Sequence, residues 1–456
     1  MAAPNPPPPN PWATGAPAWA PPPSTPWTPD PGPDGRAKVS RRRFLAGAAG
    51  VGVAGAAALA LTRDRWSGLL TGGPPAGQSL ATGKGILVLV TLYGGNDGLN
   101  TVIPYLDSSY LNGRPTLGYP PDQVIPLGDG LALHPNMKGM KALWDAKELA
   151  VVRGVGYPNP VLSHFRGMDI WQTGSPDHPV ATGVFGRWLD ATGSDPMRAI
   201  SIGNTLPRLL TGEHSSGTAI AGGTITLPGD AANGGALASL VAPGPDRSGL
   251  AAQVAQSGSD LLEVQHTLSD LLSSAPASPG APAGPPAPNK AGKAAATAGT
   301  LTEQLAVVAQ LITAGASTRV YQVSMGGFDN HSQEKDTHAR LMGELDTAIS
   351  GFLAALRGHP KGQSAVLMTY SEFGRRVAEN LSGGTDHGTA APLFVAGPAV
   401  KGGQFYGEEP SLTDLDNGNL KFTTDFRQVL ATMLADVVGV DPTVALAGRF
   451  PTLKIL

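Results

Sequence analysis

Acidic and imidazole side chains that suit a divalent metal ion gather in one glycine-rich stretch. Residues 381–400 read LSGGTDHGTAAPLFVAGPAV, which places Asp386 beside His387, between glycines and ahead of an apolar run. A carboxylate and an imidazole both bind metals well, and a glycine-rich loop lets the backbone close around an ion. The apolar run 391–396 predicts a buried strand that anchors the loop. The stretch is therefore a candidate metal-binding loop.

Similar residues follow two other predicted strands. The run 319–324, RVYQVS, leads to GGFDNH, which contains Asp329 and His331. A turn does not require both an acid and an imidazole, so these two residues favour a ligand role. The buried run 364–369, SAVLMT, leads to Glu372. We therefore include Asp329, His331 and Glu372 among the candidate ligands.

Two of the candidate acids also have structural alternatives. Asp97 follows the continuous apolar run 85–93, GILVLVTLY, which predicts a central parallel strand covered on both faces. Open α/β sheets bind ligands at this point, but taken alone the residue is explained better by a turn with Asp97 as a helix cap. Glu372 is explained equally by an ion pair with Arg375 or Arg376.

Ser163 begins a predicted helix that continues to Trp171 and starts with Ser-His-Phe-Arg. A helix N-terminus and a nearby cation both stabilise an alkoxide and bind an incoming anion, which makes Ser163 a candidate nucleophile. Spacing alone favours the ordinary role of serine as a helix cap. Arg166 would hold an oxyanion of the substrate or form a salt bridge, and His164 lies beside the serine. These three residues are the candidate catalytic group.

Alternating strands and helices must bring these residues together. Strand-type runs at 85–93, 150–155, 319–324, 364–369 and 391–396 are separated by helix-type segments. This order predicts an α/β fold with a doubly wound, mostly parallel sheet flanked by helices. The carboxyl ends of its strands share one edge, where the acids and histidines would bind one or two divalent ions. Paired ions suit phosphoryl or sulfuryl transfer, because they polarise the non-bridging oxygens and shield the leaving charge.

Composition narrows the classes of function. The 456 residues carry a net charge of −3 with 15% charged residues, so nothing indicates an electrostatic surface for nucleic acid. The chain has no cysteine, which excludes disulfides and thiolate zinc sites and is consistent with export. The glycines after the first predicted strand fit neither GxGxxG nor GxxxxGK, so they do not form a phosphate-cradling loop.

The N-terminal region is typical of an export address. Residues 1–39 are rich in proline and predict disorder. Residues 40–61, SRRRFLAGAAGVGVAGAAALAL, join a basic cluster to a weakly hydrophobic run, and SRRRFL resembles the twin-arginine signal. A short membrane anchor or a chance basic cluster is the alternative. Residues 62–84 read as a linker to one domain, 85–456, which has an Ala/Pro-rich insertion at about 273–298.

This export signal predicts a partner and a location. We expect the chain to engage the twin-arginine translocation machinery and to cross the cytoplasmic membrane. Its destination would be the periplasm, the cell surface or the medium. The Ala/Gly run is short and diluted for a membrane helix, so we expect no stable transmembrane span after processing.

Five segments in order resemble a family of exported bacterial proteins, known as domain of unknown function 1501, that looks like a branch of the alkaline phosphatase and sulfatase superfamily. They are GGNDGLN, SHFRGMDIWQTG, GGFDNH, SEFGR and GGTDHG. The resemblance covers the chain from about residue 85 to the C-terminus, outside the insertion. It implies an alkaline phosphatase-like domain and an exported metal-dependent hydrolase of phosphate or related esters, with a small anionic ester as substrate.

The resemblance also implies a role for each candidate residue. Ser163 would be the nucleophile at the helix N-terminus, and Asp386 would bind the metal or orient His387. The metal ligands would be Asp97, Asp329, His331, Glu372, Asp386 and His387.

Three departures from the superfamily pattern bear on the activity. Glu372-Phe373 stands where the superfamily often has Asp-His, and the spacing from Asp329 to His331 is shorter than usual. Ser163 lacks the Cys/Ser-x-Pro-x-Arg context that sulfatases use. These departures argue against a sulfatase and leave the number of metal ions at one or two. The alternative function is a non-catalytic exported binding or assembly protein on the same scaffold.

Overall fold

The computed structural model describes residues 85–193, 195–221, 249–274 and 299–456. The predictions for the N-terminal disordered segment, the export signal and the linker lie outside these residues, as does the Ala/Pro-rich insertion from residue 275 onward. Within the described ranges, no helix combines the length and the apolar character needed to cross a membrane.

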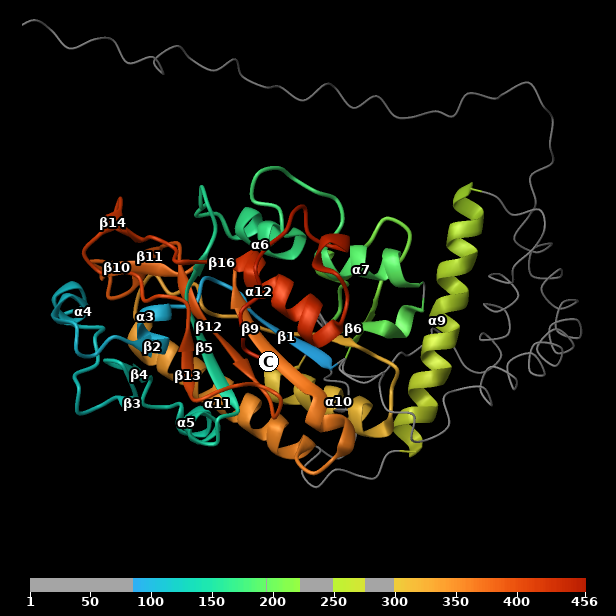
Figure 1. Ribbon diagram of the computed structural model, residues 1–456, viewed down its shortest axis with the longest axis horizontal. Helices are drawn as coiled ribbons and strands as arrows, with labels where there is room; N and C mark the ends of the chain where they lie inside the picture. The colour runs from blue at the N-terminus through green and yellow to red at the C-terminus, as the bar shows by residue number, and fades with distance from the viewer. Residues whose placement is uncertain (1–84, 194, 222–248, 275–298) are drawn as a thin grey trace, which may run out of the picture. The chain divides into compact units, whose positions relative to one another are not determined.

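In the described part of the chain, a mixed sheet of nine strands forms the centre of the fold (Figure 1). Its order is β13-β5-β12-β9-β1-β8-β6-β7, and β16 pairs with β5. The central strand β1, Ile86–Leu92, is parallel to β8, Val320–Met325, and to β9, Ala365–Ser371. Strand β12, Ala391–Ala396, is antiparallel to both β9 and β5, Leu149–Gly156. The predicted α/β class with a mostly parallel sheet is confirmed.

The other strands are short. The main sheet also contains β6 (Ala199–Ile202), β7 (Thr218–Ile220), β13 (Gln404–Tyr406) and β16 (Thr424–Asp425). Small sheets among the described residues join β2 (Val102–Ile103), β3 (Ile125–Gly128) and β4 (Leu131–Leu133), then β10 (Arg375–Glu379) and β11 (Thr385–His387), and β14 (Leu415–Asp416) and β15 (Asn419–Leu420).

Strand direction explains why the candidate residues meet. Strands β5, β9, β1 and β8 all run the same way, so their carboxyl ends lie at one edge of the sheet. Because β12 runs the opposite way, its first residue lies at that same edge. The loop that precedes β12 carries Asp386 and His387 and therefore reaches the loops that follow the parallel strands.

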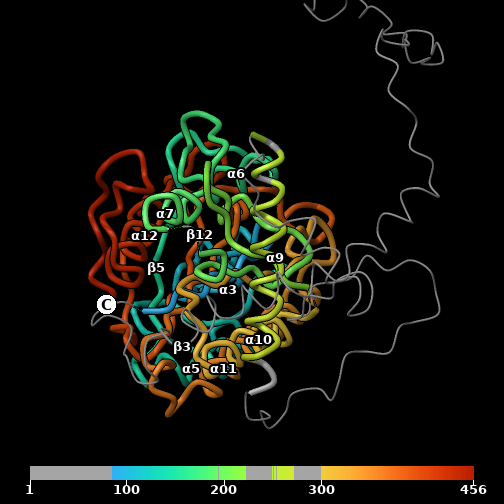
Figure 2. The backbone as a smooth tube through the Cα atoms, turned by 90° about the vertical axis from the view of Figure 1, so that its right-hand side faces the viewer, coloured from blue at the N-terminus to red at the C-terminus, as the bar shows by residue number. Residues whose placement is uncertain are grey.

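Helices cover both faces of the sheet (Figures 1 and 2). One face is covered by α5 (Lys138–Asp145), α10 (Leu301–Ala314) and α11 (Glu334–Leu356), and the other by α6 (His164–Thr173), α7 (Val184–Thr192) and α12 (Phe426–Thr432). The remaining helical segments are α3 (Gly98–Thr101), α4 (Ser108–Gly113), α9 (Gly249–Ser274), the π-helix η5 (Met433–Val438) and the 3₁₀ turns η1 (Pro196–Arg198), η2 (Arg208–Leu210), η4 (Pro360–Ser364) and η6 (Pro442–Val444).

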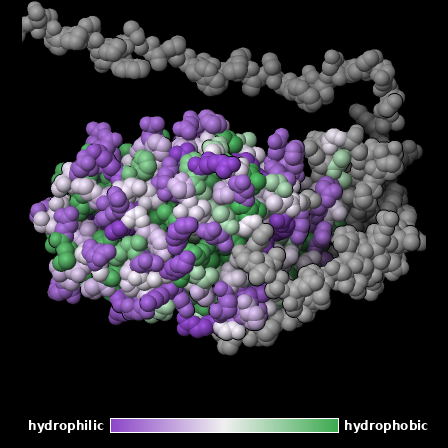
Figure 3. Space-filling view, in the orientation of Figure 1, coloured by the Kyte–Doolittle hydropathy of each residue, from purple (hydrophilic) through white to green (hydrophobic). Residues whose placement is uncertain are grey.

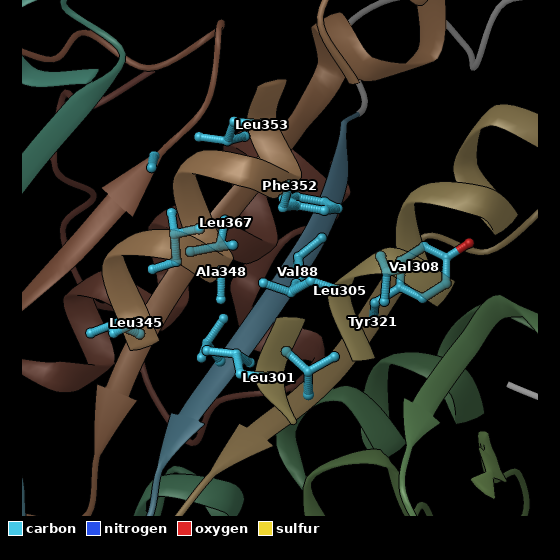
Figure 4. Packing of buried hydrophobic residues seen from close by; sticks show 14 of the residues in the cluster. Val88, Leu301, Leu305, Val308, Tyr321, Leu345, Ala348, Phe352, Leu353 and Leu367 are labelled. Atoms are coloured by element: carbon cyan, nitrogen blue, oxygen red, sulfur yellow. The ribbon is translucent and has the colours of Figure 1, made fainter. Parts of the chain in front are cut away.

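The central strand is buried on both faces. Val88 lies in the cluster formed with α10 and α11, where Figure 4 shows it near Phe352 and Leu305. Leu87 and Leu89 belong to the cluster on the opposite face. A strand covered on both faces needs apolar residues at every position, which accounts for the continuous run in the sequence. On the face shown in Figure 3, hydrophilic residues predominate and hydrophobic ones are scattered among them.

Two segments with the apolar spacing of a helix differ from the structure at their ends. Residues 134–149 have this spacing, but α5 covers only Lys138–Asp145, because His134 is buried in a loop where its ring contacts Tyr119. Residues 423–438 also have it, but this segment begins with strand β16 and then passes from α12 into a π-helix. In both cases, tertiary contacts override a local pattern that suits a helix.

Candidate metal centre

A buried arginine holds the loops at the carboxyl edge of the sheet together. Arg375 is 2% exposed, and its guanidinium donates a 2.7 Å hydrogen bond to Oδ1 of Asp329. The same guanidinium also donates hydrogen bonds to four backbone carbonyl oxygens, those of Gly94, Gly95, Phe328 and Thr385. Because these groups come from the loops after β1 and β8 and from β11, one side chain sets the relative position of three segments.

Two glycines allow these loops to approach closely. Gly94 has φ +118°, and a Cβ there would lie 2.5 Å from the backbone nitrogen of Asp329. A Cβ on Gly384 would lie 2.3 Å from the carbonyl carbon of His331. Any larger residue would push the loops apart, so glycine is required at both positions.

Three side chains on these loops form a candidate metal site. His164, Asp329 and His387 each offer one ligand atom, and these atoms lie within 4.8 Å of one another. Oδ1 of Asp329 is 3.4 Å from Nε2 of His164 and 3.2 Å from Nε2 of His387. Two imidazoles with one carboxylate are a donor set that zinc uses in catalytic sites, where further positions stay open for water or substrate.

Outer hydrogen bonds turn both histidine rings toward this point. Nδ1 of His387 lies 2.8 Å from the carbonyl oxygen of Leu162, which only accepts, so the nitrogen carries the proton. Nδ1 of His164 lies 2.8 Å from Oε1 of Glu372 and donates in the same way. Each Nε2 then presents a lone pair, as ligand histidines do. Nε2 of His164 is buried and has no hydrogen-bond partner among the described residues, which fits a bound cation.

Glu372 is an outer partner in this structure. Its carboxylate is 1% exposed, and Oε1 accepts from the backbone nitrogen of Gly94 at 2.8 Å as well as from His164. Oε2 is 3.1 Å from the hydroxyl of Ser371. In this structure its oxygens orient the His164 ring and the β1 turn, and its role as a metal ligand stays a prediction. The alternative pairing with Arg375 is not formed, since that arginine binds Asp329.

His331 and Asp386 lie at the outer rim of the candidate site. Nε2 of His331 is 3.0 Å from Nε2 of His387 and 3.1 Å from Oδ1 of Asp329. Oδ1 of Asp386 is 3.7 Å from Nδ1 of His331, and the side chains of both rim residues are about half exposed. Asp386 thus lies closer to His331 in this structure, and its role as a metal ligand or as a partner of His387 stays a prediction.

The remaining predicted acid, Asp97, does not reach the candidate site with a free carboxylate. Arg114 binds both of its oxygens, at 2.5 and 2.9 Å, and the two side chains are 2% and 0% exposed. Burial acts to raise the pKa of Asp97, but the facing guanidinium outweighs it and lowers the pKa. In this structure an arginine supplies the positive charge that its carboxylate needs, and a metal-binding role for Asp97 stays a prediction.

A second acid beside this ion pair keeps its proton. Burial and the neighbouring charge of Asp97 raise the pKa of Glu334 to about 9. Oε2 of Glu334 accepts a 2.7 Å hydrogen bond from Thr385, which precedes Asp386 and His387 on β11. This carboxyl group therefore connects the buried ion pair to the strand that carries the outer part of the site.

The candidate nucleophile lies next to the metal site along the chain. Ser163 occupies the N-cap position of α6, yet its side chain makes no capping hydrogen bond and is exposed. Its neighbour Leu162 accepts from His387, and its other neighbour, His164, belongs to the metal group. The helix-cap role favoured by spacing is therefore not used.

Arg166 is engaged outside the candidate metal site. Its guanidinium donates to Oδ2 of Asp169 at 2.5 Å and to the carbonyl oxygens of Ser175 and Pro176. The salt-bridge alternative is the one that the structure forms. The expectation that Arg166 holds the oxyanion at the metal is corrected, because its donors already have these acceptors.

The charge state of Asp329 suits a metal ligand. Burial acts to raise its pKa, but the hydrogen bond and the positive charge of Arg375 act against burial, and the pKa is lowered to about 2. The carboxylate is therefore ionised at neutral pH while 48% of its side-chain surface remains exposed. An ionised and accessible oxygen between two imidazoles attracts a cation.

Sequence reasoning missed two parts of this arrangement. It placed His164 with the catalytic residues, although the ring belongs to the metal group, and it considered Arg375 only as a partner of Glu372. The position of His164, directly after the loop that follows β5, could have indicated that the ring belongs to the metal group. No local pattern marks Arg114, which lies 17 residues from its partner Asp97.

Comparison with protein families gives a match in the second half of the chain. Residues 286–449 match a family described as "Protein of unknown function (DUF1501)". The family resemblance expected from the sequence is thus confirmed, and Asp329, Glu372 and His387 lie within the matched segment. The search of curated proteins found no match.

Solved structures give matches of low identity to this chain. A protein in the alkaline phosphatase superfamily from Vibrio parahaemolyticus matches at 10% identity and TM-score 0.39, over 80% of this chain and 69% of that one. The lipoteichoic acid synthase LtaP from Listeria monocytogenes matches at 8% identity and TM-score 0.36, over 82% of this chain and 76% of that one. The phosphonate monoester hydrolase SpPMH from Silicibacter pomeroyi matches at 11% identity and TM-score 0.36, over 80% of this chain and 76% of that one. Because these TM-scores lie below 0.5, the site is interpreted from its own residues.

Replacement of Glu334 by glutamine should remove a pH dependence of stability. Between the ordinary acid pKa near 4.5 and the folded pKa of about 9, the folded chain holds a proton that the unfolded chain releases. Stability from this group therefore falls as pH rises through that window, by at most about 1.4 kcal/mol per pH unit. Urea unfolding from pH 5 to pH 9 should show a flatter profile for Glu334→Gln than for the wild-type protein.

Glutamine has nearly the shape of a protonated glutamate, with a carbonyl oxygen that accepts hydrogen bonds and an NH2 group that donates them. Glu344→Gln is the control, because that acid lies on the same helix in an exposed ion pair. Parallel pH profiles for the wild type and Glu334→Gln would contradict a protonated Glu334.

Proposed function

We propose that the chain binds one divalent cation and hydrolyses phosphate or related anionic esters. The observation that carries the proposal is the group formed by His164, Asp329 and His387, whose ligand atoms lie within 4.8 Å. Both rings turn an Nε2 lone pair toward the ionised carboxylate. Zinc suits this donor set, and open coordination positions would leave room for an ester oxygen.

The bound cation would polarise the ester oxygens and lower the pKa of a nearby hydroxyl. Ser163 is our candidate for that hydroxyl, since it is exposed, makes no cap bond and lies between Leu162 and His164, which both contact the metal group. Its oxygen would attack the ester centre, and the bond to the leaving oxygen would break. Water would then release the acid from the serine.

A single cation is favoured over a pair. Arg114 neutralises Asp97, and Glu372 orients His164, so two of the acids expected for a second ion are already bound. Arg375 also donates to Asp329 and adds a permanent positive charge beside the site. A guanidinium there stabilises an anionic substrate in part as a second cation would.

We also propose that the chain reaches its place of action by the twin-arginine route. The support is SRRRFL at residues 40–45 followed by a weakly hydrophobic run. A folded protein with a preloaded metal would suit this route.

Metal binding provides the first test. After dialysis against zinc, elemental analysis should find one equivalent per chain. His387→Ala and His164→Ala should each weaken zinc binding by more than the ~10–100-fold expected for Glu372→Gln, which changes only an outer partner. The control is His266→Ala, since that ring is 68% exposed on α9. Equal zinc affinity in His387→Ala and the wild type would refute the site.

Turnover provides the second test. The zinc-loaded protein should hydrolyse at least one of a panel of aryl phosphate monoesters, diesters and sulfates. Ser163→Ala should lower kcat at least ~10³-fold, because the covalent route is lost. Ser108→Ala, at the exposed start of α4, serves as the control and should have no effect. Unchanged turnover in Ser163→Ala would exclude this nucleophile, and zinc binding without turnover on the panel would favour the non-catalytic alternative.

Export provides the third test. In a bacterium with the twin-arginine system, the full chain should appear outside the cytoplasmic membrane. Replacing Arg41 and Arg42 together by lysine should retain it inside, because the receptor reads the arginine pair. Cell fractionation measures the distribution. Equal export of both forms would show that another address is used.

A further inference from the structure

A groove leads away from the candidate metal site along α6. It has a volume of about 390 Å³, and its lining includes His164 and Glu372. We call the part formed by these two residues the inner end, because it adjoins the candidate metal site, and the part formed by Arg208 the outer end. The other lining residues are Tyr93, Phe165, Met168, Asp169, Gln172 and Arg208. A volume in this range accommodates a small organic molecule. The groove is therefore a separate binding surface that is continuous with the cation site.

One face of α6 supplies most of the groove. Phe165, Met168, Asp169 and Gln172 follow the pattern i, i+3, i+4 and i+7, so they share one face of the helix. Phe165 is 91% exposed although it is a large aromatic residue. Exposed aromatic side chains beside a groove with polar groups are typical of ligand-binding surfaces.

The outer end of the groove carries positive charge. Asp169 forms ion pairs with both Arg166 and Arg208. One carboxylate therefore faces two guanidiniums, which leaves a net charge of +1. Arg208 lines the groove and is 47% exposed, so it can turn to a ligand while Arg166 keeps Asp169 paired. An anionic group is the natural partner of this end.

Polar groups lie between the two ends. Burial and the nearby charge of Glu372 raise the pKa of Tyr93, so its hydroxyl stays protonated at neutral pH. The side-chain oxygen of Gln172 accepts from the backbone nitrogen of Leu209, which ties α6 to the turn that carries Arg208. This hydrogen bond connects the helix that begins with His164 to the turn that carries Arg208.

We propose that the substrate is an ester whose non-reacting part carries an aromatic or similarly flat apolar unit and a second anionic group. Phe165 and Met168 contact the apolar unit, and Arg208 binds the second anion. This inference rests on the proposed cation site, which binds the reacting ester group at the inner end. Arg208 and Phe165 are then the residues that set specificity.

Calorimetry with zinc-loaded protein tests this inference without turnover. The probes are methylphosphonate, phenylphosphonate and 4-carboxyphenylphosphonate, which add first an aromatic ring and then a second anion. Affinity should rise at each step, by about fivefold for the ring and about tenfold for the carboxylate. Phe165→Ala should remove the gain from the ring, and Arg208→Gln should remove only the gain from the carboxylate.

The control is Arg340→Gln, which breaks an exposed ion pair of the same kind with Glu344 on α11 and should change no affinity. Equal affinity of the three probes for the wild-type protein would overturn the inference. So would an equal loss for all three in Arg208→Gln, since the arginine would then act through the fold or the cation.

The outcomes for the groove and for the hydrolase are distinguishable. The predicted order of affinities without any turnover would support the groove and reject the hydrolase. Turnover that does not discriminate between phenyl and 4-carboxyphenyl esters would support the hydrolase and reject the groove. Zinc binding with no affinity for any probe would reject the groove and leave the cation site standing.

Discussion

The geometry of the candidate site depends on the buried guanidinium of Arg375. A charged group is costly to bury unless acceptors replace its water. Here four backbone carbonyls and the carboxylate of Asp329 do so, and they belong to segments far apart in the sequence. The loops must therefore close around the arginine before its charge is satisfied. That closure brings His331 and His387 to the same carboxylate.

Charge is distributed in two layers at this edge of the sheet. In the buried layer, Arg114 neutralises Asp97 and Glu334 stays protonated, so the network needs no metal. In the outer layer, Asp329 is ionised and accessible and faces two imidazole lone pairs. The inner layer supports the loops, and the outer layer retains capacity to bind a cation. This division separates the acids at the strand ends that are already neutralised from the one that faces two imidazoles.

Much of the fold was predictable from the sequence, because the apolar runs that form its strands are local patterns. The apolar run of β1 indicated a strand buried on both faces, and β12 was predicted with the bounds that it has, Ala391–Ala396. The direction of β12 was not predictable, since a buried strand has the same composition whether its neighbours are parallel or antiparallel. Its antiparallel course is nonetheless what brings His387 to the same edge as His164.

By itself, the sequence determined which residue types stand at the strand ends and that those ends would share an edge, because hydrophobic periodicity and glycine-rich turns are local properties. It therefore indicated Asp329, His331 and His387. Only the tertiary structure decided which carboxylates remain available. Arg114 and Arg375 reach Asp97 and Asp329 across 17 and 46 positions of the chain, and such pairings depend on how the loops pack. Arg114 binds both oxygens of the buried Asp97, whereas Arg375 binds one oxygen of Asp329, which stays half exposed and faces two imidazoles. The two acids look alike in a sequence, and only their surroundings distinguish the buried ion pair from the candidate ligand.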